Sequence, residues 1–456
     1  MNRRKLLAAG AATAVLAGSA TRAAAPAKRP PNFIVVLCDD LGYGDVSIYG
    51  PGGIRTPAIE RLAREGVVLT DYYAPANLCS PSRAGLLTGR YPVRTGLGYE
   101  VIQVKDDRGL PLTETIIAKA LKPAYATALF GKWHLGHLGA SWPPTNHGFD
   151  SFFGIPYSHD MSPLSLFEAH AGSGEVTRSP VDYPQLQQRF YDHAERFIEA
   201  NRDRPFFVEL ALSAPHLPEH PHAPFDATTY AGPYGAVVAE IDSIVGRLMA
   251  KLRALKLEND TVVVFTSDNG PWFEGSPGWM RERKGGGGYD GGYRVPFVAW
   301  APGRIPAGRR VASMIMGIDL LPTFRAMAGM APLAGVALDG RDITEVLTRG
   351  AASPHEELIL FDNEVPVAVR TQDWKYVDAI YYRGVKWPMS LFGYQELYDE
   401  RTGRAENYSV AEVHPEIAKA MKARLDAAKA TFAPYKHADI PAAYKALGAQ
   451  MAHIQD

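Results

Sequence analysis

The chain has 456 residues, which is long enough for one large domain and a smaller one. Its 48 Lys and Arg residues nearly balance its 49 Asp and Glu residues, and no long run of one sign occurs, so bulk-charge binding to nucleic acid or to an anionic membrane is disfavoured. Hydrophobic residues make up 46% of the chain, which predicts a globular fold rather than a disordered one.

The N-terminal 25 residues have the pattern of an export signal. The basic residues Arg3–Lys5 precede a small, apolar stretch over 6–18, and Ala23–Ala25 supplies a cleavage site. A membrane anchor needs about 18 or more apolar residues, so we expect a cleaved signal at 1–25 and no anchor. The paired arginines resemble a twin-arginine signal, while general secretion stays open. Either route predicts a periplasmic or secreted protein.

Alternating strand and helix patterns follow. The apolar, β-branched runs Asn32–Cys38 and Thr261–Thr266 predict strands that are buried on both faces of a parallel sheet. Helical patterns lie between these two runs, at 58–66, 114–121, 186–200 and 234–255. The alternation predicts a doubly wound α/β domain, to which we assign residues 26–345.

The last part of the chain has a different pattern. Short strand-like segments at 358–361, 367–370 and 374–377 precede an amphipathic helix at about 415–431. We therefore predict a smaller α+β domain over residues 346–456.

Polar residues stand where the two long strands end. Asp39-Asp40 follows the first strand, and Asp268-Asn269 follows the second. Ligands collect at the carboxyl ends of the strands in such sheets, and an all-oxygen set suits Ca²⁺ better than Mg²⁺. The alternative is that these residues only start turns.

Two cysteines are present, which excludes a disulfide framework, and their spacing is not that of a zinc site. Cys38 ends an apolar strand and is expected to be a buried structural residue. Ser80 as N-cap and Pro81 in the first turn would place Cys79 just outside a helix N-terminus, in a positive field near Arg83. The alternative for Cys79 is a buried apolar filler.

The segment around Cys79 resembles the signature of the sulfatase family. It reads Cys-Ser-Pro-Ser-Arg at 79–83, followed by Leu-Thr-Gly-Arg at 87–90. Further segments resemble motifs of the family, in the same order along the chain: 39–45, 131–136, 213–216, 267–270 and 284–296. The segment Gly154–Asp160 resembles the arylsulfatase A branch of the family and its bacterial members.

The resemblance implies an alkaline-phosphatase-like mixed sheet and a defined site. Cys79 would be oxidised to formylglycine (3-oxoalanine) by a formylglycine-generating enzyme. The residues expected to hold one calcium ion are Asp39, Asp40, Cys79, Asp268 and Asn269. The expected catalytic residues are Cys79, Arg83, Lys132 and His134. The residues expected to bind substrate are Lys132, Ser158, His216 and Lys284.

The implied reaction releases inorganic sulfate from an aryl or carbohydrate sulfate ester. The hydrated aldehyde would attack sulfur, with Asp268 as base, to give a sulfated covalent intermediate. His134 would then remove a proton from the second hydroxyl, so that C–O cleavage expels sulfate. His216 and Lys284 would serve the leaving group.

One segment departs from the family pattern. Asp290 stands where the family often has Glu, and four glycines, 285–288, follow Lys284 directly. This composition predicts a looser loop around Lys284.

Two other functions are alternatives to sulfate-ester hydrolysis. A phosphatase or phosphonate hydrolase of the same superfamily would need ligands for a second metal, and Lys132 and Lys284 appear in that region instead. A non-catalytic binding protein would lack some of the expected catalytic residues, and none of them is missing from this sequence.

Overall fold

The computed structural model describes residues 29–437, except 51–53, 226–230, 383–384 and 389–392. The predicted export signal at 1–25 therefore lies outside the described residues. No helix in the described part of the chain is long and apolar enough to cross a membrane.

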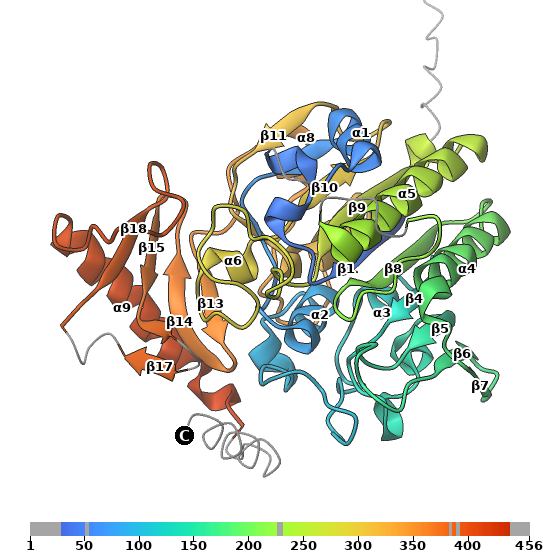
Figure 1. Ribbon diagram of the computed structural model, residues 1–456, viewed down its shortest axis with the longest axis horizontal. Helices are drawn as coiled ribbons and strands as arrows, with labels where there is room; N and C mark the ends of the chain where they lie inside the picture. Colours follow the sequence, from blue (N-terminus) through green and yellow to red (C-terminus); the bar gives the residue numbers. More distant parts are fainter. Residues whose placement is uncertain (1–28, 51–53, 226–230, 383–384, 389–392, 438–456) are drawn as a thin grey trace, which may run out of the picture.

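Within the described residues, ten strands form one large sheet in the order β11-β2-β10-β9-β1-β8-β4-β5-β6-β7 (Figure 1). The five central strands, β9 to β5 in that order, run parallel, and β10, β6 and β7 pair antiparallel with their neighbours. The strands are β1 (Asn32–Asp39), β2 (Val67–Leu69), β4 (Ala126–Lys132), β5 (Ser151–Ile155), β6 (Leu166–His170), β7 (Val176–Ser179), β8 (Phe206–Pro215), β9 (Thr261–Ser267), β10 (Phe297–Trp300) and β11 (Arg309–Val311). The predicted α/β fold with a mixed sheet is confirmed.

Helices cover both faces of this sheet. Strand β1 shows why: Phe33, Val35 and Leu37 enter one hydrophobic core, while Ile34 and the residues that alternate with it enter the other. One face is covered by α2 (Cys79–Thr88), α3 (Ile117–Ala120), α7 (Leu320–Met327) and α8 (Thr344–Arg349). The other is covered by α1 (Pro57–Glu65), α4 (Leu186–Ala200) and α5 (Gly232–Ala254). Burying each such side chain contributes about 1.5–3 kcal/mol.

The helix predicted at 114–121 is shorter in the structure and spans only Ile117–Ala120. The Glu114 backbone N–H donates to the Pro111 carbonyl in a turn, and Ile116 has extended backbone. Because the chain turns before Ile117, the helical pattern before that residue was misleading.

The C-terminal part forms a separate antiparallel sheet with one long helix beside it (Figure 1, orange to red). The sheet order is β13 (Leu358–Asp362), β14 (Val365–Arg370), β15 (Trp374–Val377) and β18 (Glu396–Asp399). Helix α9 (Pro415–Phe432) buries Ala418, Met421, Leu425, Ala428 and Phe432, a helical spacing of three and four, in a third core with this sheet. The shorter elements are β3 (Tyr72–Tyr73), β12 (Ile315–Met316), β16 (Ala379–Tyr382), β17 (Val385–Pro388) and α6 (Asp290–Tyr293).

Candidate active site

Four parallel strands end at one edge of the large sheet, and each delivers a polar side chain there. Asp39 ends β1, Lys132 ends β4, His216 follows β8, and Asp268 follows β9. All four side chains are buried. Buried charges need partners of opposite charge, so the acidic and basic side chains at this edge have to pair with one another.

Acidic and thiol ligand atoms meet at this edge. One atom from each of Asp39, Asp40, Cys79 and Asp268 lies within 4.8 Å of the others. Asn269 donates from Nδ2 to Asp40 Oδ1 at 2.7 Å, and its buried Oδ1 has no hydrogen-bond partner among the described residues. Three carboxylates and an unused amide oxygen form a hard oxygen donor set, which fits a calcium ion.

Basic side chains surround the carboxylates. Lys132 Nζ lies 2.7 and 2.9 Å from the two oxygens of Asp39, and Lys284 Nζ lies 2.7 Å from Asp40 Oδ2. Arg83 Nη2 lies 2.8 Å from Asp268 Oδ2, and Arg83 also donates to the Lys132 carbonyl. The structure therefore brings together the predicted acidic and basic residues in one buried cluster.

The carboxylates of this cluster differ in acidity. Burial opposes ionisation of Asp39, but Lys132, His216 and Arg83 outweigh it and hold the pKa of Asp39 well below its usual range. Burial raises the pKa of Asp268 to about 6, although Arg83 acts against the rise. Asp268 is therefore the more basic carboxylate of this pair.

The sequence predicts that Cys79 lies just outside the helix N-terminus. In the structure, Cys79 is instead the first residue of α2. Leu78 is the N-cap, and Ser80 Oγ accepts a hydrogen bond from the Ile102 N–H at 3.0 Å instead of capping the helix. Cys79 Sγ lies 3.4 Å from Asp39 Oδ1. Burial raises the pKa of the Cys79 thiol well above its usual value, against the effect of Lys132 and Lys284. Burial therefore disfavours the thiolate form of an unmodified Cys79.

His134 adjoins the cluster with a free ring nitrogen. Its Nε2 lies 2.9 Å from the Ile102 carbonyl, and its buried Nδ1 has no partner among the described residues. Burial, followed by Lys132 and Arg83, lowers the pKa of His134 well below its usual value. The ring is therefore neutral at pH 7, and Nδ1 can accept a proton.

His216 and Ser158 differ in how closely they approach the carboxylates. His216 Nε2 lies 3.6 Å from Asp40 Oδ2. Ser158, in the loop after β5, is buried, and its Oγ has no hydrogen-bond partner within the described part of the chain. The Ser158 hydroxyl is thus available to a ligand, and it forms no hydrogen bond with the described residues of the cluster.

Backbone hydrogen bonds hold the loop that carries Lys284, which the sequence predicted to be loose. The Lys284 N–H donates to the Pro271 carbonyl at 2.9 Å, and the Gly285 N–H donates to the Asn77 carbonyl at 3.0 Å. Asp290, at the end of the loop, is buried and pairs with Lys375 of β15 at 2.6 Å. The C-terminal sheet therefore helps to hold this loop.

Cys38 is fully buried in the core on one face of the sheet, as expected for a structural residue. Burial raises the pKa of its thiol well above the usual value, with Asp268 and Asp39 adding to the rise. Both cysteines are free, so no disulfide consumes Cys79.

The chain is similar to known proteins over most of its length. The family model described as Sulfatase matches residues 31–330. The chain belongs to the sulfatase family. It is 37% identical to human arylsulfatase A, over 89% of this chain and 90% of that protein. It is 36% identical to N-acetylgalactosamine-6-sulfatase of the dog, over 72% and 68% of the two chains. The crystal structure of PsFucS1 sulfatase from Pseudoalteromonas sp. superposes with a TM-score of 0.82, at 27% identity over 90% and 92% of the chains.

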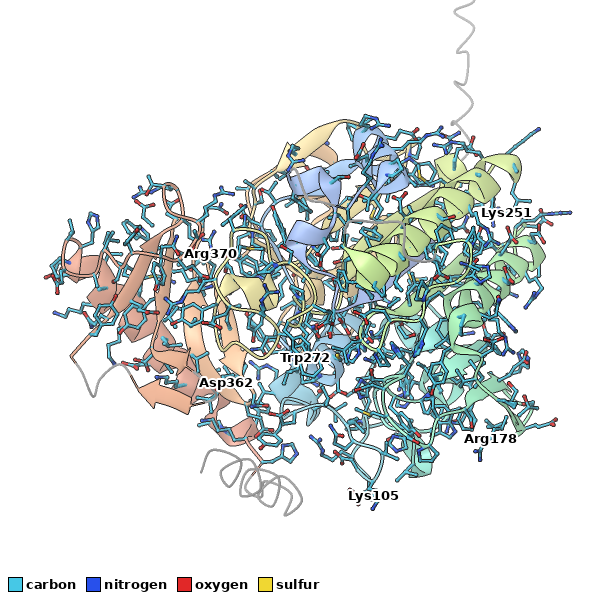
Figure 2. All side chains as sticks on the ribbon, in the orientation of Figure 1. Lys105, Arg178, Lys251, Trp272, Asp362 and Arg370 are labelled. Carbon is cyan, nitrogen blue, oxygen red and sulfur yellow. The ribbon has the colours of Figure 1, made fainter. Side chains whose placement is uncertain are left out.

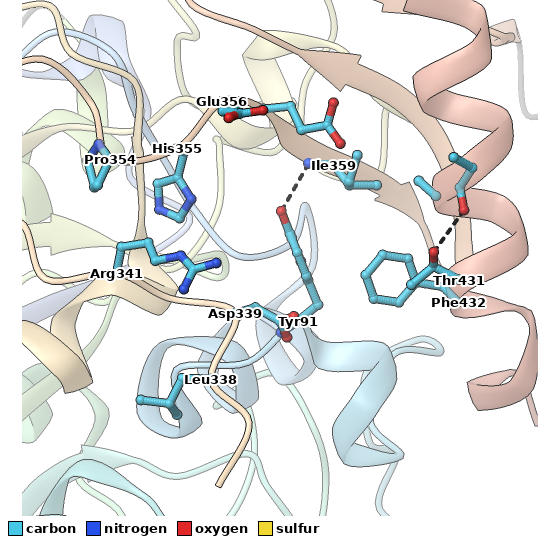
Figure 3. Close-up of a pocket in the computed structure, with 13 residues that line it drawn as sticks. Tyr91, Leu338, Asp339, Arg341, Pro354, His355, Glu356, Ile359, Thr431 and Phe432 are labelled. Carbon is cyan, nitrogen blue, oxygen red and sulfur yellow. Dashed lines mark hydrogen bonds between the residues drawn. The ribbon is translucent and has the colours of Figure 1, made fainter. Parts of the chain in front are cut away.

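Elsewhere in this sulfatase, a cavity of about 500 Å³ lies between helix α9 and the segments that carry Tyr91 and Arg341 (Figure 3). Tyr91, Arg341, His355, Ile359 and Phe432 are among its lining residues, and Tyr91 Oη accepts a hydrogen bond from the Ile359 N–H. None of the predicted site residues lines this cavity. Its size alone therefore does not mark the active site.

Glu209 is a buried acid of β8 that interacts with Arg83, and no motif or local pattern in the sequence points to it. Burial raises the pKa of Glu209 to about 7, from 4.5, although Arg83 acts against the rise, and its Oε2 accepts no hydrogen bond from the described residues. Between those two pH values the unfolded chain releases a proton that the folded chain keeps. Glu209 therefore costs stability progressively as the pH rises through this window.

We expect the free energy of unfolding of Glu209→Gln, relative to that of the wild type, to increase by up to about 3 kcal/mol as the pH rises from 5 to 8. The reason is that Gln does not titrate. Urea denaturation of both proteins at the two pH values measures the difference. Glu175→Gln, at an exposed position, is the control and should show no such gain. Equal stability differences for Glu209→Gln at both pH values would contradict the expectation.

Proposed function

We propose that this sulfatase releases inorganic sulfate from aryl or carbohydrate sulfate esters at the buried cluster. The supporting observation is that Asp39, Asp40, Asp268 and Cys79 meet at one point and are surrounded by fixed cations. A sulfate monoester is an anion, so a nucleophile can approach its sulfur only where positive charge is held in advance. One relative is named for aryl sulfates and another for a sulfated amino sugar, so both substrate classes remain in the proposal.

Two groups complete the proposed site. A calcium ion held by Asp39, Asp40, Asp268, Asn269 and residue 79 would supply positive charge to the sulfate and to the nucleophile. As a hydrated formylglycine, made from Cys79 by a formylglycine-generating enzyme, residue 79 would supply one hydroxyl that takes the sulfuryl group and a second that allows its release.

The chain's own side chains then bind the sulfate and move protons. Lys132, Lys284 and Ser158 hold the sulfate oxygens, with Arg83 keeping Asp268 in place. Asp268 accepts the first proton, and its bond to the calcium ion would lower its basicity.

Two histidines handle the remaining protons in this proposal. His134 is neutral, and its Nδ1 removes the proton from the second hydroxyl, which drives C–O cleavage. His216, together with Lys284, faces the leaving oxygen and supplies its proton.

A phosphatase or phosphonate hydrolase is the main competing function. Lys132 and Lys284 pair with Asp39 and Asp40, so fixed cations rather than ligands for a second metal adjoin these carboxylates. Fixed lysines suit the lower charge of a sulfate ester. We expect kcat/KM for 4-nitrophenyl sulfate to exceed that for the phosphate and phosphonate esters by roughly tenfold or more. A higher kcat/KM for either phosphorus ester would overturn the assignment, and turnover of any ester excludes a non-catalytic protein.

Mass spectrometry of the protein from its natural host tests the modification and the proposed export together. The peptide that contains residue 79 should carry an aldehyde in place of the thiol. The mature chain should begin after Ala25, in the periplasmic or secreted fraction. An unmodified Cys79 in active enzyme would refute the nucleophile, and an uncleaved N-terminus would refute the signal.

A further inference from the structure

The loop between Pro271 and Trp279 exposes large aromatic side chains. Trp272 is 38% exposed and Phe273 is 66% exposed. Ten large hydrophobic side chains are this exposed among the described residues, and three of them, Trp272, Phe273 and Trp279, lie in this one loop. Such concentrations of exposed apolar surface mark binding sites more often than single exposed residues do.

Hydrogen bonds fix this loop on both sides. The Ser276 N–H donates to Asp45 Oδ1 at 2.9 Å, and the Ser276 carbonyl accepts from the Gly44 N–H at 2.8 Å. On the other side, Arg283 donates to the carbonyl of Trp272 at 3.1 Å and to that of Gly275. The aromatic side chains are therefore held exposed by an ordered backbone, which lowers the entropy cost of binding a ligand.

Trp272 lies directly beside the groups that contact Asp40. Lys284 Nζ is 5.3 Å from the centre of the Trp272 ring, and the ring centres of His216 and Trp272 are 6.2 Å apart. In the view of Figure 2, Trp272 lies near the middle of the molecule. An alcohol bonded to a sulfate held by Lys284 would meet Trp272 and its neighbour Phe273, whose ring centre is 4.8 Å from that of Trp272.

Glu274 follows the two aromatic residues directly in the loop and carries a hydrogen-bond acceptor. Both of its carboxylate oxygens are buried, and neither accepts a hydrogen bond from another described residue. Asp40 and His216 both act on Glu274 electrostatically, which places it near the same site. Its own backbone N–H donates to the carboxylate, and hydroxyl groups of a ligand would supply further donors.

We propose that Trp272, Phe273 and Glu274 form the subsite for the leaving group, and that this group is a hydroxylated ring of the sugar class. The inference rests on the proposed sulfate-ester hydrolysis and specifies its alcohol. The two aromatic rings take the apolar C–H face of the sugar, and Glu274 accepts from its hydroxyls. A simple aryl group would use the rings but not the carboxylate.

Steady-state kinetics of the modified, calcium-loaded, full-length enzyme test this subsite. The substrates are a panel of sulfated monosaccharides and 4-nitrophenyl sulfate, which has no hydroxyl on its ring. We expect Trp272→Ala to raise KM roughly tenfold for the best monosaccharide sulfate, with a smaller change in kcat. Trp272→Phe should recover much of this loss.

The control variant is Trp279→Ala on the same loop. Trp279 is 44% exposed, and its ring faces Tyr43 and Arg294 rather than Lys284 or His216. Its KM should stay within about twofold of the wild-type value. Glu274→Gln should raise KM for the sugar sulfate and leave KM for 4-nitrophenyl sulfate unchanged, which separates hydroxyl recognition from a general disturbance.

Several results would overturn the subsite. An unchanged KM in Trp272→Ala, or equal rises of KM in Trp272→Ala and Trp279→Ala, would refute the proposed contact between Trp272 and the leaving group. Equal changes of KM for the sugar sulfate and for 4-nitrophenyl sulfate in Glu274→Gln would refute the assignment of the leaving group to the sugar class. Wild-type enzyme that releases sulfate from no ester refutes the proposed function and this inference with it, whereas an active wild type with insensitive variants refutes the subsite alone.

Discussion

Cys79→Ala is expected to lower kcat by roughly 10⁴-fold or more, because removing the covalent nucleophile removes a group on which both chemical steps depend. Alanine at this position also leaves Asp39 and Asp40 without the neighbouring ligand atom. Sulfate release under saturating substrate measures the loss, and binding of a product anion checks that the site is still folded.

Cys38→Ala is the matched control, because Cys38 is also a buried, free cysteine. It points into the core, so we expect a loss of about 1–2 kcal/mol in stability and a kcat near that of the wild type. Equal and complete loss of activity in both folded variants would contradict the different roles given to the two cysteines.

Cys79→Ser tests the need for the second hydroxyl. A serine can accept a sulfuryl group but has no second hydroxyl from which His134 could take a proton, so we expect at most one slow turnover per enzyme molecule. Sustained turnover by Cys79→Ser at the wild-type rate would show that the diol is unnecessary.

The predictable part of the site follows from the topology of the sheet. Asp39 and Asp268 are 229 positions apart, yet β1 and β9 are parallel neighbours, so their carboxyl ends meet. The apolar runs before these residues predicted two strands of a parallel sheet, and the pairing of β1 with β9 brings the ends of these strands together. The order of the sulfatase motifs supplied the loop residues, such as Lys284 and His216, whose positions no strand pattern could give.

The unpredicted features depend on contacts between distant segments. The N-cap assignment at Ser80 failed because its hydroxyl is used by Ile102, 22 residues away. The pairing of Asp290 with Lys375 joins the Lys284 loop to the C-terminal sheet, and neither residue has a local pattern that signals it. No sequence pattern marks Trp272 either, because its exposure and its distance from Lys284 arise only in the folded chain.

Removal of the metal is expected to abolish most activity while leaving the fold intact. Three carboxylates would still be compensated after chelation, because Lys132, Lys284 and Arg83 each lie within 2.9 Å of one of them. Reactivity should nevertheless fall by about 10²–10³-fold or more, since the positive charge that acts on the developing anion is lost. Circular dichroism should change little.

Calcium should restore activity to the chelated enzyme better than zinc does, because the donor set of Asp39, Asp40, Asp268 and Asn269 consists of hard oxygens. Sulfate release is measured before chelation, after it, and after addition of each ion, with elemental analysis of the same samples. A fully active preparation that contains no metal would refute the calcium site. Better recovery with zinc would refute the choice of ion, because it would mean that the sulfur or nitrogen groups near residue 79 dominate the binding rather than the three carboxylates.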